Sequence, residues 1–190
     1  MNEVKVSSYT VESGIPEQPF GWPETEYGSK NRLENLRGKA KDLSKTGLHI
    51  LLAPESGIIE EKFSIDKVDK DPYLGFEVVC NSFLVHLNEP GKNIFNSKPI
   101  TQWSSPVLVP NILDIREAII QSKETRNLPS KEQKVVGDYL LQHGRDLQGN
   151  KYLNKHIAQA AYYKGSEREI QLAIGMFAGF RQLEIICEKV

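Results

Sequence analysis

Hydrophobic and polar positions along the first half of the chain follow two different spacings. Several segments show alternating apolar residues or short apolar runs between turn residues, which is typical of strands. Residues 24–44 are rich in helix formers and end shortly before Gly47, which favours a helix there. The predicted strands cover residues 4–11, 48–59, 73–87 (one or two strands) and 106–110.

After Pro110 the apolar residues recur at helical spacing, and this pattern predicts a series of helices. Asn111 and Ser130 stand where they could cap two of them, and Gly144 is a plausible stop signal. The last segment opens with Ser166 as a possible N-cap and finishes with the strand-like run "LEIIC". The mixture of strands and helices indicates an α/β or α+β class. The predicted helices cover residues 111–122, 130–144, 151–164 and 166–190.

Composition places the chain among ordinary globular proteins. Its 190 residues suffice for one domain with a sizeable core, and we find no linker or internal repeat that would divide residues 1–190. The net charge of −1 gives no basic excess that would indicate nucleic acid or an acidic membrane as a partner. The chain carries no signal-peptide pattern and no apolar stretch of transmembrane length. Cys80 and Cys187 lie in apolar strings, which favours buried free thiols and a cytoplasmic location.

Common catalytic and cofactor motifs are missing from the sequence. The four histidines and two cysteines show no zinc-ligand spacing, and neither a GxxxxGK[ST] nor a GxGxxG phosphate-binding loop occurs. A GxSxG nucleophile elbow is also lacking. The remaining candidates for catalysis or metal binding are glutamate side chains.

Two predicted strands end in the same triplet, Glu-Ser-Gly. Glu12 precedes Ser13-Gly14, and Glu55 precedes Ser56-Gly57. Carboxylates at strand ends, beside glycines that let a ligand approach the backbone, suit a magnesium ion that faces a phosphate. The alternative is that both are ordinary glutamates in turns.

The stretch "VESGIPEQPFGWPETEYGSKNR", residues 11–32, closely resembles the start of the inosine/xanthosine triphosphatase family. That family has a strand ending in Asp or Glu, followed by Ser-Gly-Val, Gln-Pro, Gly, Glu-Thr and Gly-x-x-Asn-Arg. The resemblance continues more weakly over residues 4–163, where "LLAPESGI" is similar to the family's Glu-Ala-Gly-Ile strand and "KVVGDYLL" to its last strand region. The matching residues here are Glu12, Ser13, Gly14, Ile15, Gln18, Pro19, Gly21, Glu24, Thr25, Gly28, Asn31 and Arg32.

The resemblance implies an α/β fold with a mixed central sheet flanked by helices, and a homodimer. It implies hydrolysis of inosine or xanthosine triphosphate to the diphosphate and phosphate. It further implies Mg²⁺ or Mn²⁺ held by Glu12 and Glu55, with Glu55 as the catalytic residue and Ser56 close to the nucleoside triphosphate. Gln18 and Arg32 match positions that could bind substrate. Arg32 could reach a phosphate or pair with a carboxylate such as Glu24, and we favour a structural role for Gln18, Asn31 and Arg32.

The chain departs from the family pattern at both ends. We expect the family's Thr-x-Asn-Pro-x-Lys-like turn, which cradles phosphates at a helix N-terminus, to be missing from the N-terminus, because residue 1 stands a few residues before the family's second strand. Residues 164–190 extend beyond the family's usual finish. This extension could be an appended helix, or a permuted element in which Gly165, Ser166 and Arg168 replace the phosphate turn. We expect it to fill the core position of the missing strand and helix, with residues 183–187 paired to the sheet and Ile174 and Phe177 buried.

Two functions of different classes follow from these observations. Retention of both carboxylates favours a magnesium-dependent triphosphatase. Absence of the phosphate turn favours a catalytically inactive relative that acts as a nucleotide-binding or protein-interaction module.

Overall fold

The structure, a computed structural model, describes residues 5–40, 43, 45–60, 73–88, 95–96, 98–104, 106–110, 113–144 and 150–151. Helices and strands are both present, as an α/β chain requires, and the strands within these residues form one five-stranded sheet. The elements are α1 (Trp22–Lys39), β1 (Gly47–Ile59), β2 (Tyr73–Asn88), β3 (Phe95–Asn96), β4 (Ile100–Trp103), β5 (Val107–Pro110), α2 (Leu113–Thr125), the 3₁₀ turn η2 (Ser130–Glu132) and α3 (Val136–His143).

The sheet is organised around β2, which is one continuous strand of 16 residues. Along one edge β2 pairs with β1 over the full length of β1, and along the other it pairs in turn with β5, β4 and β3. All of these pairings are antiparallel. In the described residues, the parallel component expected of a mixed sheet is limited to an isolated bridge between Phe20 and Ile58.

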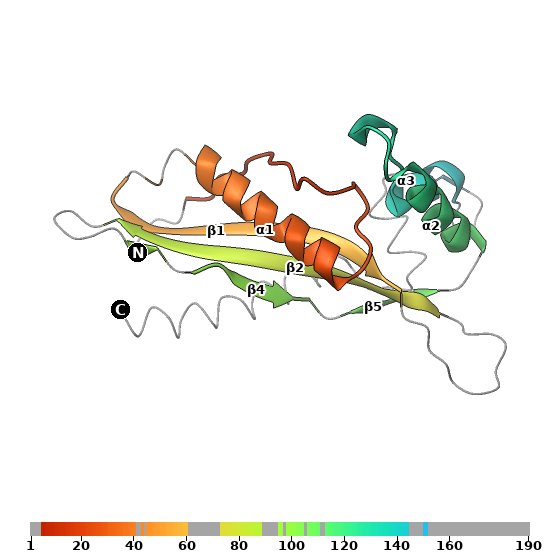
Figure 1. Ribbon diagram of the computed structural model, residues 1–190, viewed down its shortest axis with the longest axis horizontal. Coiled ribbons are helices and arrows are strands. Elements are labelled where there is room, and N and C mark those ends of the chain that lie inside the picture. Colours follow the sequence, from red (N-terminus) through yellow and green to blue (C-terminus); the bar gives the residue numbers. More distant parts are fainter. Residues whose placement is uncertain are drawn as a thin grey trace.

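Helix α1 lies across β1 and β2 (Figure 1), and small residues bring it close to the sheet. Thr25 sits over Gly57, where a Cβ atom would lie 3.0 Å from the Thr25 Cβ and overlap its hydroxyl. The Ser29 hydroxyl donates a hydrogen bond to the Ala53 carbonyl at 2.8 Å. Leu33 then continues the same face of α1 into an apolar cluster with β1 and β2. The buried face of α1 is therefore half polar, and it fits the sheet by size more than by hydrophobicity.

The predicted strand over residues 4–11 is wrong in the described part, because residues 5–11 form no strand. The backbone of residues 10–13 is held instead by side chains of α1. The carbonyl groups of residues 10, 12 and 13 accept hydrogen bonds from Lys39, Asn35 and Asn31, each at 2.8 Å. These three donors recur every four residues and so share one face of the helix. Backbone acceptors that a neighbouring strand would satisfy are thus satisfied by helix side chains.

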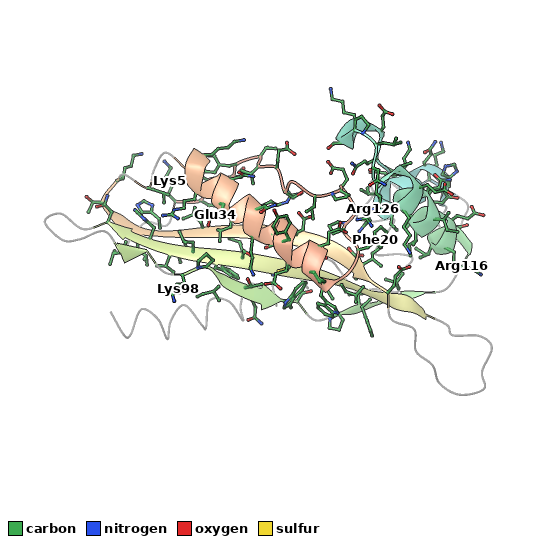
Figure 2. The ribbon with its side chains drawn as sticks, viewed as in Figure 1. Lys5, Phe20, Glu34, Lys98, Arg116 and Arg126 are labelled. Atoms are coloured by element: carbon green, nitrogen blue, oxygen red, sulfur yellow. The ribbon has the colours of Figure 1, made fainter. Side chains whose placement is uncertain are left out.

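A second part of the core lies at the β5 end of the sheet, where α2 and α3 are found (Figure 1). Their apolar side chains pack with Val107 and Val109 of β5 and with Ile58 of β1. Phe20 packs against this cluster, and the Arg126 guanidinium lies 5.8 Å from the centre of its ring. Figure 2 shows Phe20 and Arg126 close together, and Arg126 directly follows the last residue of α2. The loop before α1 is therefore joined to the α2–α3 unit.

Several element boundaries differ from the sequence expectation. Helix α1 ends at Lys39 rather than at residue 44. Ser130 begins the short turn η2, and the N-cap of α3 is Val135, so the expected single helix over 130–144 is two elements. Gly144 does end α3, with its N–H bonded to the Leu140 carbonyl. The periodicity correctly predicts α3 as a helix, whereas the resemblance to a strand region there is wrong.

Helix α2 and strand β5 appear where the sequence predicts them. Expectations for Asn111 as a cap, for Cys187, and for all elements from residue 152 onward lie outside the described residues. The same is true of the proposed burial of Ile174 and Phe177.

The close contact of α1 with β1 predicts that Gly57→Ala will destabilise the fold. Its new Cβ would overlap Thr25, and such overpacking costs about 1–3 kcal/mol. Gly38→Ala is the matched control, because a Cβ there meets nothing within 4 Å and alanine stabilises a helix by up to about 1 kcal/mol over glycine. Urea unfolding of both variants measures the difference, and Thr25→Ala should partly rescue Gly57→Ala. A Gly57→Ala variant as stable as the parent would contradict this packing.

Candidate functional site

An ion pair between Arg32 and Glu55 forms the centre of the candidate site. The Arg32 Nε donates to Glu55 Oε2 at 2.7 Å, and its Nη1 donates to the Val11 carbonyl at 3.3 Å. Arg32 thereby joins α1, β1 and the segment that precedes the first Glu-Ser-Gly triplet. The expected alternative partner, Glu24, is engaged elsewhere: it accepts hydrogen bonds from the Phe20 N–H and from Arg126.

Glu55 lies inside β1 rather than at a strand end, which corrects the sequence expectation. Strand β1 continues through Ser56 and Gly57 to Ile59, with unbroken pairing to β2. Glu55 is directed to the face that α1 covers, because a Cβ on Gly28 of α1 would lie 3.0 Å from Glu55 Oε2. The absence of a side chain at Gly28 thus leaves room for this carboxylate, which is 8% exposed.

Glu12 is exposed and does not follow a strand. Its carbonyl group accepts the Asn35 bond, and the neighbouring Ser13 carbonyl accepts the Asn31 bond. Gly14 follows with a φ of 69°, a left-handed conformation that favours glycine. The backbone around the first triplet is therefore fixed beside Arg32, while the Glu12 side chain faces solvent.

Burial raises the pKa of Glu55 above its ordinary value of 4.5. The hydrogen bond and the charge of Arg32 oppose this shift in pKa, as does the backbone N–H of Ser56, and the nearby Glu17 adds to it. Removal of the carboxylate from water thus outweighs the favourable guanidinium. Such an acid holds a proton more tightly than an exposed glutamate.

The other two predicted substrate-binding residues lie apart from Glu55. The Ser56 hydroxyl donates to Glu77 at 2.8 Å, and neighbouring strand residues point to opposite faces of a sheet. Only the backbone of Ser56 is therefore beside the Glu55 carboxylate. The Gln18 side chain is buried, and its oxygen accepts the Val136 N–H at 3.4 Å at the start of α3. Gln18 joins the N-terminal loop to α3, a structural role.

The donor set fits a preformed two-carboxylate magnesium site poorly. Mg²⁺ prefers ionised carboxylate oxygens, but Glu55 is paired with Arg32 and has a raised pKa. Within the described residues, no three His, Cys, Asp or Glu side chains cluster as ligands. Glu12 is the predicted ligand whose carboxylate is presented to solvent. Any Mg²⁺ at this site would depend chiefly on oxygens supplied by a ligand.

The sequence did not indicate a second set of polar residues on the far face of the sheet. Glu77, which accepts the Ser56 hydrogen bond, is buried, and Asn81 is fully buried with no hydrogen-bond partner for its amide group. Both stand within an apolar stretch of β2. A glutamate and an asparagine inside an apolar run are unusual, and this could have identified both residues from the sequence. Cys80 lies between them in the sequence but on the face that α1 covers; it is a buried free thiol, as predicted, and burial raises its pKa to about 12.

Comparisons with known proteins give only weak similarity to the solved structure described here. No family model matches the chain. Among solved structures, the chain is similar to "protein VC0702 from Vibrio cholerae", with 15% sequence identity and a TM-score of 0.46, over 89% of this chain and 75% of that one. Within the described residues, no helix combines the length and the apolar character needed to cross a membrane.

The raised pKa predicts how Glu55 affects stability across pH. An acid whose pKa is higher in the folded than in the unfolded chain stabilises the fold fully below the unfolded pKa, and this contribution is lost as pH rises through the folded pKa. Glu55→Gln cannot titrate. The free energy of unfolding of the wild type, minus that of Glu55→Gln, should therefore fall as pH rises above 4.5.

Urea unfolding at a series of pH values measures this difference, with Glu132→Gln, in the exposed η2 turn, as the control for loss of one carboxylate. A difference that grows with pH would show that the Arg32 charge outweighs burial, contrary to the account above.

Proposed function

We propose that this chain binds nucleoside triphosphates and, with Mg²⁺, hydrolyses non-standard purine nucleotides such as inosine and xanthosine triphosphate to the diphosphate and phosphate. The single observation that carries the proposal is the position of Arg32 between Glu55 and the Val11 carbonyl. Residues that resemble one triphosphatase motif, but lie 20 or more positions apart, are joined through this one side chain. Their convergence supports a shared site.

Arg32 is the proposed phosphate ligand. Its side chain is 32% exposed, and two of its N–H groups are used by Glu55 and Val11. A guanidinium carries five donors in a planar arrangement that matches phosphate oxygens. The remaining donors are therefore available to a triphosphate that approaches along the segment of residues 12–14.

Glu55 is the proposed proton acceptor. Hydrolysis forms a bond between a water oxygen and the terminal phosphorus, breaks the bond to the bridging oxygen, and leaves that oxygen on the nucleoside diphosphate. The attacking water must lose a proton, and a carboxylate of raised pKa accepts it more readily than an ordinary one. Its pairing with Arg32 keeps Glu55 beside the group that holds the phosphate.

In this proposal Mg²⁺ arrives with the triphosphate, as part of the substrate, and neutralises phosphate charge. Glu12 is the chain's proposed contribution to its coordination, because its carboxylate is exposed next to the Arg32-bound backbone. This assignment places Glu12 and Glu55 in different roles. Loss of Glu12 should then raise the Mg²⁺ concentration that turnover requires, whereas loss of Glu55 should remove the chemical step.

A second candidate function is a nucleotide-binding or protein-interaction module without turnover. The ion pair itself favours it, because a carboxylate held by a guanidinium is often a structural partner of that guanidinium. Both candidates predict binding of nucleoside triphosphates or of a partner at the same junction, and only the first predicts phosphate release.

Phosphate release from inosine, xanthosine and guanosine triphosphates, with and without Mg²⁺, distinguishes the two candidates. We expect Mg²⁺-dependent release from the inosine and xanthosine nucleotides. Binding of these nucleotides without release would favour the non-catalytic module. If the full chain neither binds these nucleotides nor releases phosphate from them, the nucleotide proposal is overturned.

We predict that Glu55→Gln lowers turnover by at least ~100-fold, the usual contribution of a general base, with substrate affinity retained through Arg32. Since Glu55 is buried and paired, this variant should also change the stability of the fold. Its activity is therefore measured well below the melting temperature, beside Glu132→Gln as control. Turnover equal to that of the control would remove Glu55 from the mechanism.

A further inference from the structure

Two histidines stand directly opposite each other near one end of the β1–β2 pair. His49 of β1 and His86 of β2 are partners in the strand register, and the centres of their rings are 5.8 Å apart. Directly opposed residues of an antiparallel pair hold their Cβ atoms about 4.5–5.5 Å apart, so both rings rise from one face of the sheet. The spacing of the histidines in the sequence did not indicate this pair, because only the pairing of the strands brings them together.

Backbone carbonyl groups between α1 and β1 orient both rings. The Nε2 atom of His49 lies 3.0 Å from the Lys45 carbonyl oxygen, and that of His86 lies 2.9 Å from the Leu43 carbonyl oxygen. A carbonyl oxygen can only accept a hydrogen bond, so each Nε2 carries the proton and, in a neutral ring, the lone pair is on Nδ1. Histidines that bind metals almost always donate their other ring N–H in this way, which fixes the ring and raises the basicity of the ligating nitrogen.

The pair lies at the border between an apolar cluster and solvent. Leu51 and Leu84, the next opposed pair on the same face, are both buried. On the other side of the pair, Gly47 precedes His49 on this face of β1, and a Cβ on Gly47 would meet nothing within 4 Å. Water can therefore reach the rings from the side of Gly47, while Leu51 separates them from Glu55 farther along the strand.

We propose that His49 and His86 bind one transition-metal dication, of the zinc, nickel or copper class, through their Nδ1 atoms, with water as the other ligands. Imidazole nitrogen is a preferred ligand of these ions. Two imidazoles that share an ion in tetrahedral geometry, with bonds of about 2.0–2.1 Å, keep their ring centres roughly 5–6 Å apart. The observed separation of 5.8 Å lies in this range.

The ion acts as a clamp on the end of the sheet. Its two ligands join β1 to β2, and their Nε2–H groups join both strands to the chain that follows α1. Because the folded chain holds the two rings together and the unfolded chain does not, binding should raise the melting temperature as the metal concentration rises. Mg²⁺ prefers oxygen ligands, so this ion differs from the one in the proposed function, and the inference does not depend on that function.

Isothermal titration calorimetry of the full chain, first freed of metal with a chelator, tests the site with Zn²⁺ as the probe. We expect a binding site that His49→Gln weakens at least ~10-fold, since loss even of an outer-shell partner has an effect of this size. His143→Gln, which removes an exposed histidine of α3, is the matched control and should leave the affinity unchanged. No Zn²⁺ binding by the full chain, or equal affinity in the two variants, would overturn the proposal.

Nuclear magnetic resonance of the imidazole nitrogens tests the site in the unsubstituted chain, so a variant that folds poorly does not decide the result. Zn²⁺ should shift the ¹⁵N signals of Nδ1 in both His49 and His86, while each Nε2 keeps its proton. Mg²⁺ at the same concentration should shift neither signal. A response of only one ring, or of Nε2 in place of Nδ1, would contradict a shared ion at these two atoms.

Discussion

The close approach of α1 to β1 is the constraint on which the described structure depends. Two glycines make it possible: Gly57 leaves space for Thr25, and Gly28 leaves space for Ile15 and for the Glu55 carboxylate. A larger side chain at either position would separate the helix from the strand. Because Arg32 follows Gly28 by one helical turn, this contact also sets the distance at which Arg32 meets Glu55. The packing of the fold and the geometry of the candidate site thus share one origin.

The same helix organises the chain that precedes it. Its outer side chains bind the carbonyl groups of residues 10–13, so that the first Glu-Ser-Gly triplet lies beside the second although no strand carries it. A segment held by long polar side chains exposes more of its backbone to solvent than a segment within a sheet. An approaching phosphate could therefore reach the backbone around Gly14 as well as Arg32.

Sequence patterns predicted those elements whose own residues carry the signal. The apolar runs of β1, β2 and β5, the helical periodicity of α2, and the stop at Gly144 are local features, and the structure has them. The prediction of a strand over residues 4–11 was wrong, because the alternation "VKVSSYTV" does not indicate whether a neighbouring strand is present to pair with it. In the described residues its neighbours are α1 side chains rather than a strand.

Of the residues that the resemblance assigns to substrate binding, the structure brings Arg32 and Glu55 into contact. The sequence analysis allowed Arg32 a carboxylate partner but named Glu24, which is engaged elsewhere. The pairing of Arg32 with Glu55 and the raised pKa of Glu55 depend on burial by α1, which residue spacing does not reveal. Likewise, the opposite directions of Glu55 and Ser56 follow only once β1 is seen to continue through both residues.

The most direct test of the central claim, that Arg32, Glu55 and residues 11–14 form one triphosphate site, is a nuclear magnetic resonance titration of the Arg32 side-chain Nε–Hε signal with magnesium inosine triphosphate. The account predicts a saturable shift of this signal, together with the backbone amides of Ser13, Gly14 and Ser56, while amides of α3 such as Leu140 stay in place. Inosine, which lacks the phosphates, should produce no such shift. An unchanged Arg32 signal at saturating nucleotide would contradict the account.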